Sequence, residues 1–189
     1  DPAPSAAGRG LAAPLLQPGE TDFLIYAGSG QAQWSPSVAY NPARNEYLVA
    51  FVHNNGSGSH AANIYAYRLN QSGDLVGGLI AVSTANDFQL DPYVTFNSDA
   101  NEYLVVWSDN RSGNTGGGVF RPDIYAQRIR ASDGQLVGGN FAITTHASSS
   151  QSRPRVAYDA ASQRYLVVWQ DGRTGTWQIY GQRLDSNAA

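Results

Sequence analysis

The chain has 189 residues, of which 42% are hydrophobic and only 14% are charged, and its formal net charge is −3. It has no cysteine, so it forms no disulfide and no thiolate metal site. Its cations are all arginine, and a mildly acidic chain is poorly suited to nucleic acid, whose affinity depends on clustered cations meeting phosphates. No apolar run approaches the roughly 20 residues of a membrane span.

The first residue and the composition together indicate the compartment in which the protein is found. The chain starts at Asp1 and contains no methionine, as expected when a signal peptide has been removed. Together with the polar, turn-rich composition, this predicts a secreted protein, extracellular or at the cell surface.

Residues 1–20 are rich in proline, alanine and glycine with little periodicity, so we predict a flexible arm.

Three repeats follow, at residues 31–88, 89–150 and 151–189. Their first motifs begin at Pro36, Pro92 and Pro154, followed by YLVAF (47–51), YLVVW (103–107) and YLVVW (165–169), and then by NIYAYRL (63–69), DIYAQRI (123–129) and QIYGQRL (178–184). Two copies continue with GDLVGGLIAVS (73–83) and GQLVGGNFAIT (134–144). Each full repeat therefore predicts four short antiparallel strands, the first of them starting after the proline.

The third repeat ends after its third strand, and the missing strand has a counterpart in residues 21–30. Phe23 precedes Gln33 by the same spacing that separates Leu79 from Gln89 and Phe141 from Gln151. We therefore predict that Phe23–Tyr26 is a fourth strand out of phase with the others, completing a blade of a neighbouring chain.

The string V-V-W-x-D-x-R-x-G, followed by D-I-Y-A-Q-R and G-x-L-V-G-G, resembles blade repeats of extracellular bacterial and archaeal propeller-like proteins. More distantly it resembles sialidase-type propellers. The resemblance implies an all-β fold of three four-stranded antiparallel propeller-like blades. The β-trefoil and the β-prism also have threefold pseudosymmetry, but their repeats are usually shorter.

Two loops of the same pattern are candidate ligand sites, with Asp109 and Arg111 in one and Asp171 and Arg173 in the other. They could grip a polar ligand, or the aspartates could join a calcium site. Alternatively, each aspartate bonds loop amides or pairs with the nearby arginine. Calcium takes six to eight oxygen ligands, and one aspartate per loop supplies few, so we predict no metal and no cofactor.

Aromatic and arginine residues divide into repeated and unique positions. Repeated residues are expected to serve the scaffold: the aromatics Phe51, Trp107 and Trp169 in the core, and Arg68, Arg128 and Arg183 in structural pairs. Trp34 and Trp177 each occur once and could stack on a sugar ring, or could fill gaps between blades. Sequons make Asn55, Asn70 and Asn110 candidates for glycosylation.

The sequence gives little support to catalysis. It has no H-E-x-x-H, no G-x-S-x-G, and no evident pair of facing carboxylates. We expect a non-enzymatic extracellular module that self-assembles into a filament or ring by strand exchange, using Phe23, Leu24, Ile25, Tyr26, Ile179, Tyr180 and Arg183. The alternative is a secreted lectin-like, carbohydrate-binding propeller, for instance a six-blade dimer. The expected partners are other copies of the chain and, in the alternative, glycans.

Overall fold

The computed structural model describes residues 22–26, 31–54, 62–111, 120–146 and 149–188. Within these ranges the regular structure is entirely β, in antiparallel sheets of four, four and three strands. The predicted all-β fold with one sheet per repeat is therefore confirmed. No helix in the described ranges has the length and apolar character needed to cross a bilayer.

Each sheet follows the chain from one edge to the other. The first sheet has the order β1 (Gln33–Asn41), β2 (Glu46–Asn54), β3 (Ala62–Asn70) and β4 (Ile80–Ser83). The second has the order β5 (Gln89–Asn97), β6 (Glu102–Asp109), β7 (Asp123–Arg130) and β8 (Leu136–Thr144). The third contains β9 (Gln151–Asp159), β10 (Arg164–Asp171) and β11 (Gln178–Asp185). No described strand pairs with the outer edge of β11, so that edge is open, as predicted.

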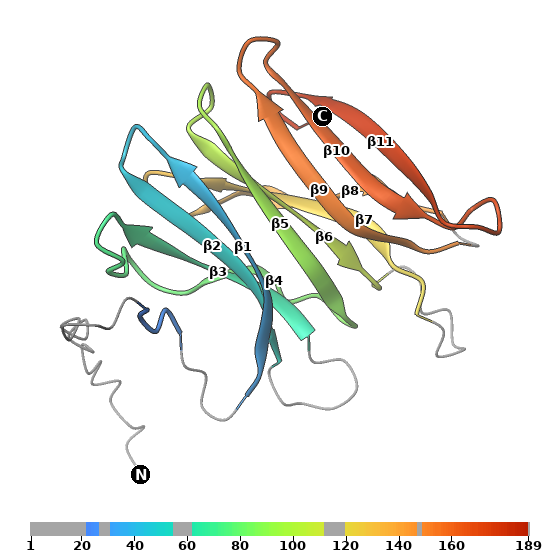
Figure 1. Ribbon diagram of the computed structural model, residues 1–189, viewed down its shortest axis with the longest axis horizontal. Helices are drawn as coiled ribbons and strands as arrows, with labels where there is room; N and C mark the ends of the chain where they lie inside the picture. Colours follow the sequence, from blue (N-terminus) through green and yellow to red (C-terminus); the bar gives the residue numbers. More distant parts are fainter. Residues whose placement is uncertain (1–21, 27–30, 55–61, 112–119, 147–148, 189) are drawn as a thin grey trace.

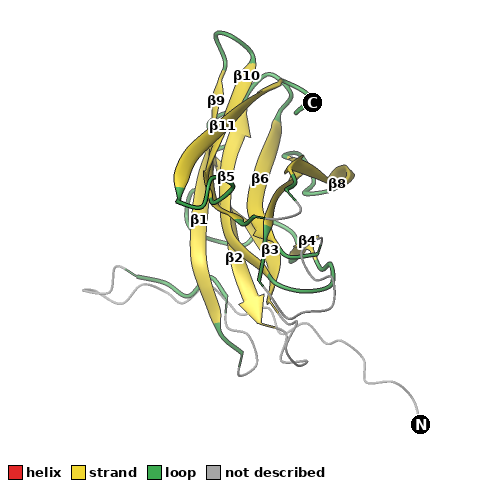
Figure 2. Ribbon diagram, turned by 90° about the vertical axis from the view of Figure 1, so that its right-hand side faces the viewer, coloured by secondary structure: helices red, strands yellow, loops and turns green. Residues whose placement is uncertain are grey.

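The sheets lie side by side in chain order, with β5 between β1 and β9 (Figure 1). The fourth strands, β4 and β8, lie on the side of the molecule opposite to β1 (Figure 2). The first strands are therefore neighbours on one side, and the outer strands are spread along the other. This arrangement of successive antiparallel sheets is propeller-like.

Two apolar layers hold the sheets together, one at each contact between neighbours. We call the face of a sheet toward the preceding repeat its front face, and the other its back face. The first layer joins the back face of the first sheet to the front face of the second, through Leu48, Ala50, Ile64, Ala66, Val94, Tyr103, Val105 and Trp107. The second joins the second sheet to the third, through Leu104, Val106, Ile124, Ala126, Val156, Tyr165, Val167 and Trp169.

The second strands show that the burial of a strand depends on whether neighbouring sheets cover one or both of its faces. β6 and β10 share the run Tyr-Leu-Val-Val-Trp, at 103–107 and 165–169. All five residues are buried in β6, because sheets cover both of its faces. In β10, Trp169 is buried but Leu166 is 50% exposed. The back face of the third sheet thus carries core-type side chains that no described residue covers.

The first strands begin earlier than predicted. Each starts at a glutamine, so the prolines lie inside the strands and not at their beginning. The residues before the prolines, Ser35, Asp91 and Arg153, have φ of 52°, 53° and 54°. The strand pairing shifts register there. Proline has no N–H for the ladder, and a bulge with a left-handed residue lets the strand continue past it.

The segment Phe23–Tyr26 is not a strand within the single chain, and its predicted pairing with a neighbouring chain stays a prediction. It lies against the front face of the first sheet, where the Tyr26 ring is 5.5 Å from Phe51 and 5.6 Å from Tyr67 between centroids. The predicted partner edge, β11, belongs to the sheet at the other end of the molecule (Figure 1). In a single chain, this segment instead lies on the apolar front face of the first sheet and covers it only in part, since Phe23 is 44% and Leu24 is 67% exposed.

Candidate functional site

The loop after β6 is closed by its own residues. Asp109 is fully buried, and its Oδ2 accepts a hydrogen bond of 2.6 Å from Trp107 Nε1. Its Oδ1 accepts from the backbone N and the Nε of Arg111, both at 2.9 Å. The Arg111 guanidinium also lies over the Tyr125 ring, 4.4 Å from its centroid. Both carboxylate oxygens of Asp109 are therefore engaged inside the protein.

The third repeat builds the same arrangement after β10. Trp169 Nε1 donates to Asp171 Oδ2 at 3.0 Å, the Arg173 N donates to Oδ1 at 3.0 Å, and Arg173 Nη2 pairs with Oδ2. The Arg173 guanidinium lies 4.2 Å from the Tyr180 ring centroid. Burial raises the pKa of Asp171, but these hydrogen bonds outweigh it and lower the pKa to about 2.

Arg111 also connects neighbouring sheets. Its Nη2 donates to Ser83 Oγ of the first sheet at 2.9 Å and to Asn140 Oδ1 of the second at 3.1 Å. The first repeat has no such pair, and in its place Gln33 Nε2 lies 3.1 Å from His53 Nδ1. The geometry of the Asp-x-Arg loops thus fits a structural role, as the alternative interpretation of the sequence held. Among the described residues, no group of three or more His, Asp or Glu side chains is placed to hold a metal ion.

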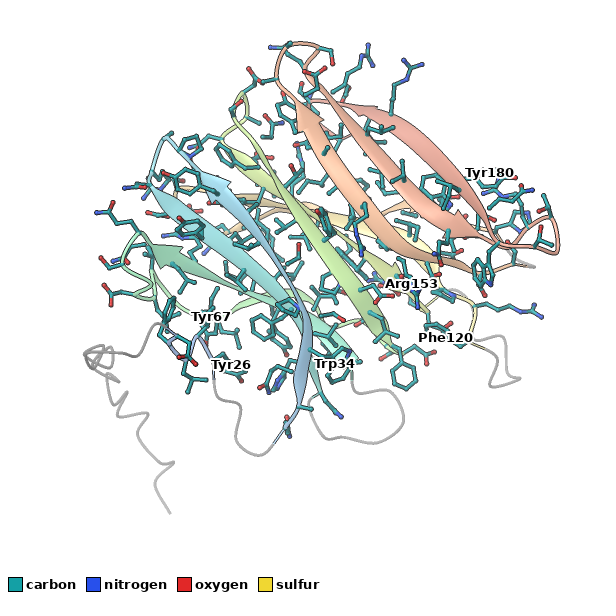
Figure 3. The ribbon with its side chains drawn as sticks, viewed as in Figure 1. Tyr26, Trp34, Tyr67, Phe120, Arg153 and Tyr180 are labelled. Atoms are coloured by element: carbon teal, nitrogen blue, oxygen red, sulfur yellow. The ribbon has the colours of Figure 1, made fainter. Side chains whose placement is uncertain are left out.

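The two unique tryptophans lie at opposite ends of the molecule. Trp34 is in β1 of the first sheet, 36% exposed beside the Phe23–Tyr26 segment (Figure 3). Trp177 precedes β11 of the third sheet and is 60% exposed. It borders a polar pocket of about 280 Å³ with Arg121, Ser149, Ser150 and Gly172. The structure therefore does not bring the two tryptophans into one site.

The predicted assembly residues of β11 are accessible. Ile179 is 72% exposed, whereas its counterparts Ile64 and Ile124 are fully buried. Arg68 and Arg128 lie 3.6 and 3.7 Å from Glu46 and Glu102, as expected for structural pairs.

Arg183 holds the equivalent position in the third repeat, but Arg164 stands where the other repeats have a glutamate. Arg183 is exposed and has no carboxylate within ion-pair distance in the described part of the chain. Tyr180 is half-buried beneath Arg173. The third sheet thus lacks the ion pair of the other two at its open end.

The candidate glycosylation sites differ in accessibility. Asn70 stands at the end of β3, where its Oδ1 accepts hydrogen bonds from the backbone N of Ser72 and Asp74, both at 2.9 Å. Asn110 is only 4% exposed and accepts from Arg121 N at 2.8 Å. Its burial makes Asn110 unsuitable as a glycan acceptor in the folded chain, because an oligosaccharide must project into solvent. Asn55 lies outside the described residues.

Sequence reasoning missed a set of amide side chains that form hydrogen bonds inside the sheets and in the turns before them. Gln89 and Gln151, which begin β5 and β9, are fully buried. Gln89 Nε2 donates to Asp87 O at 2.9 Å, and Gln151 Nε2 donates to Ser149 Oγ at 2.9 Å. Asn140 Nδ2 in turn donates to Gln127 Oε1 at 2.7 Å. The recurrence of glutamine at the same place in every repeat was the signal that could have found the first two.

No family model matches the sequence, and no curated protein matches it. Solved structures do match the fold. An endo-arabinanase of glycoside hydrolase family 43 from Bacillus licheniformis has a TM-score of 0.52 at 15% identity, over 88% of this chain and 60% of that one. A thermostable family-43 glycoside hydrolase has a TM-score of 0.57 at 10% identity, over 85% and 56%.

A Hadza microbial sialidase gives a TM-score of 0.54 at 12% identity, covering 83% of this chain and 33% of that one. The chain thus spans 60% or less of these structures. At such low identity the likeness concerns the fold alone. It supports a propeller-like arrangement distantly similar to that of glycoside hydrolases.

Proposed function

We propose that this chain is a non-enzymatic extracellular structural module that self-assembles by β-strand exchange between copies. The observation that carries the proposal is the open edge of β11. The first and second sheets each have a fourth strand beside the third, and β11 has none in the described structure. An open edge exposes unpaired N–H and C=O groups, which are a template for another strand. The extracellular location rests on the resemblance of the repeats to those of extracellular proteins.

The segment Phe23–Tyr26 has the pattern of a fourth strand. Its sequence F-L-I-Y parallels F-A-I-T at 141–144 and I-A-V-S at 80–83. Six residues separate it from β1, as six separate β8 from β9 and five separate β4 from β5. The connection therefore has the length with which a fourth strand of one sheet leads to the first strand of the next.

The existing pairs give the register of the exchange. Ala126 of β7 pairs with Phe141, and Tyr125 pairs with Ala142. In the first sheet Ala66 pairs with Ile80, and Tyr65 pairs with Ala81. By the same alignment, Gly181 of one copy is expected to lie opposite Phe23 of another, and Tyr180 opposite Leu24.

A cysteine pair tests this register directly, because the chain has no cysteine of its own. Copies carrying Leu24→Cys are mixed with differently sized copies carrying Tyr180→Cys and then oxidised. We expect a covalent heterodimer, since directly opposite residues of antiparallel strands have Cβ atoms about 4.5–5.5 Å apart. The matched control is Gln182→Cys, two residues along β11 on the same face.

Several-fold less heterodimer is expected with Gln182→Cys than with Tyr180→Cys. Equal yields from the two mixtures, or no heterodimer from either, would show that this strand does not pair with β11 in the proposed register. The non-enzymatic part of the proposal is supported by the Asp-x-Arg loops, whose carboxylates are engaged by their own tryptophan and arginine.

A second candidate function, a lectin-like module, is favoured by the surroundings of Trp177. An exposed indole beside a polar pocket with an arginine and two serines is suited to a sugar ring, with stacking on one face and hydrogen bonds at the rim. Binding of the chain to glycans, lost on Trp177→Ala with the fold retained, would favour this candidate over a purely structural role.

A further inference from the structure

Each end of the molecule presents an exposed sheet face. The equivalent faces of the other sheets are buried in contacts between neighbouring sheets of the same chain. We infer that the front face of the first sheet of one copy docks against the back face of the third sheet of another copy. This inference rests on the proposed self-assembly and adds the surfaces that carry it. The contact would repeat the two apolar contacts that already join sheets within the chain.

The back face of the third sheet is the first of these surfaces. Leu166 is 50% exposed and Ile179 is 72% exposed. Their counterparts in the first and second sheets, Leu48, Ile64, Leu104 and Ile124, are all fully buried against the following sheet. Val168 and Gly181 complete the surface at the paired positions that Ala50 and Ala66 occupy in the first repeat. In the first and second sheets, this same back face packs against the front face of the next sheet. The third sheet presents it to solvent.

The front face of the first sheet is the complementary surface. Val38 is 60% exposed, whereas Val94 and Val156, its counterparts in the second and third sheets, are 4% and 6% exposed. Tyr47 is likewise 37% exposed, and its counterpart Tyr103 is fully buried. An apolar cavity of about 520 Å³ lies over this face, bordered by Val38, Tyr47, Val49 and Leu69. The second and third sheets use the equivalent face to pack against the sheet that precedes them.

A polar contact between sheets indicates how the two surfaces align. Asn97, at the end of β5, donates to the Tyr165 hydroxyl of the third sheet at 2.8 Å. The equivalent residue at the end of β9 is Asp159, and the equivalent of Tyr165 in the first sheet is Tyr47. In the docked pair the Tyr47 hydroxyl would donate to Asp159 of the other copy.

The Phe23–Tyr26 segment now covers part of the front face, so docking requires it to leave. It fills that face incompletely, because Leu24 is 67% exposed and cavities lie on either side of Phe23 and Ile25. The same movement would free the segment to pair with β11 of the neighbour. Covering a front face and completing a third sheet are therefore alternative positions of one segment.

Docking of a front face on a back face is heterologous, so it propagates unless the rotation between copies closes a ring. Two copies that close would give a six-bladed ring, and copies that do not close would give a filament. Both outcomes use the same pair of surfaces. This property allows the surfaces to be tested without knowing the final assembly.

The test uses one charged substitution on each surface. Val38→Asp places a charge on the front face of the first sheet, and Leu166→Asp places one on the back face of the third. Both side chains are at least half exposed, so the single chain is expected to fold. Each variant alone is expected to stay a single chain at concentrations where the parent assembles. An equimolar mixture is expected to form a two-copy species, because the intact back face of one variant meets the intact front face of the other. Leu75→Asp, a 50% exposed position in the turn after β3, is the matched control and should assemble like the parent.

Sedimentation velocity separates the outcomes. Assembly of either variant alone to the extent of the parent, or a mixture in which no two-copy species forms, would overturn the docking inference. Register-specific Leu24–Tyr180 cross-linking together with unaffected assembly of Val38→Asp would reject these surfaces and keep the strand exchange. Loss of assembly in both variants without register-specific cross-linking would support the surfaces and reject the exchange.

Discussion

Replacing Trp107 with alanine is expected to lower the free energy of unfolding by about 3–5 kcal/mol, as for other large buried aromatic residues. Trp107 is fully buried between the first and second sheets. The substitution leaves a cavity in that layer and removes the indole N–H that donates to Asp109. Chemical denaturation followed by fluorescence or circular dichroism measures the loss. We expect the midpoint denaturant concentration to fall, while the slope of the free energy of unfolding against denaturant concentration stays nearly unchanged.

Trp177→Ala is the matched control, because the same side chain is 60% exposed there. Its removal is expected to change the free energy of unfolding by no more than about 0.5 kcal/mol. A Trp107→Ala variant that unfolds within that margin of the parent would contradict the account of the blade contacts.

Replacing Asp171 with asparagine is expected to cost about 1.5–3 kcal/mol near neutral pH, the range for hydrogen bonds that involve a charged group. The substitution removes the charge that pairs with Arg173 and weakens the bond from Trp169. The pKa of Asp171 is lowered to about 2 from an ordinary value of 3.8. A carboxylate with a depressed pKa stabilises the fold above its unfolded pKa, and this stability is lost as the pH falls.

The difference between parent and Asp171→Asn should therefore be largest above pH 4 and shrink as the pH falls toward 2. Unfolding by urea at a series of pH values measures it. Asp133→Asn is the control, because Asp133 is exposed and paired with Arg130 at the surface, where solvent screening leaves such pairs little effect on stability. A difference that grows on acidification would mean that the protonated form of Asp171 is the one that stabilises the loop.

The repeat made much of the fold predictable. Aligned motifs gave the three sheets, the order of strands within each, the buried aromatics Phe51, Trp107 and Trp169, and the missing strand beside β11. These features follow from local pattern, since an apolar run of strand length with a turn on either side has few other solutions. The alternative interpretation of the Asp-x-Arg loops was also available from the sequence, because an aspartate two residues before an arginine can pair with it locally.

Other features depend on contacts that the sequence does not display. The bulge before each proline could not be inferred, because the residue before a proline ordinarily avoids the helical regions of backbone space. The position of Phe23–Tyr26 depends on which apolar face is uncovered in a single chain. Burial of Asn110 likewise depends on a contact with a preceding repeat, because the Asn110 N donates to Phe88 O at 2.9 Å. In the last two cases a long-range neighbour decided between conformations that the local sequence allows.

The mass of the parent chain in solution tests self-assembly most directly. The measurement is sedimentation at a series of concentrations from low micromolar to near millimolar. Self-assembly through the ends of the molecule predicts a mass that rises with concentration from 20.2 kDa, to a two-copy ring or beyond it to a filament. A constant mass of 20.2 kDa across the whole series would contradict it.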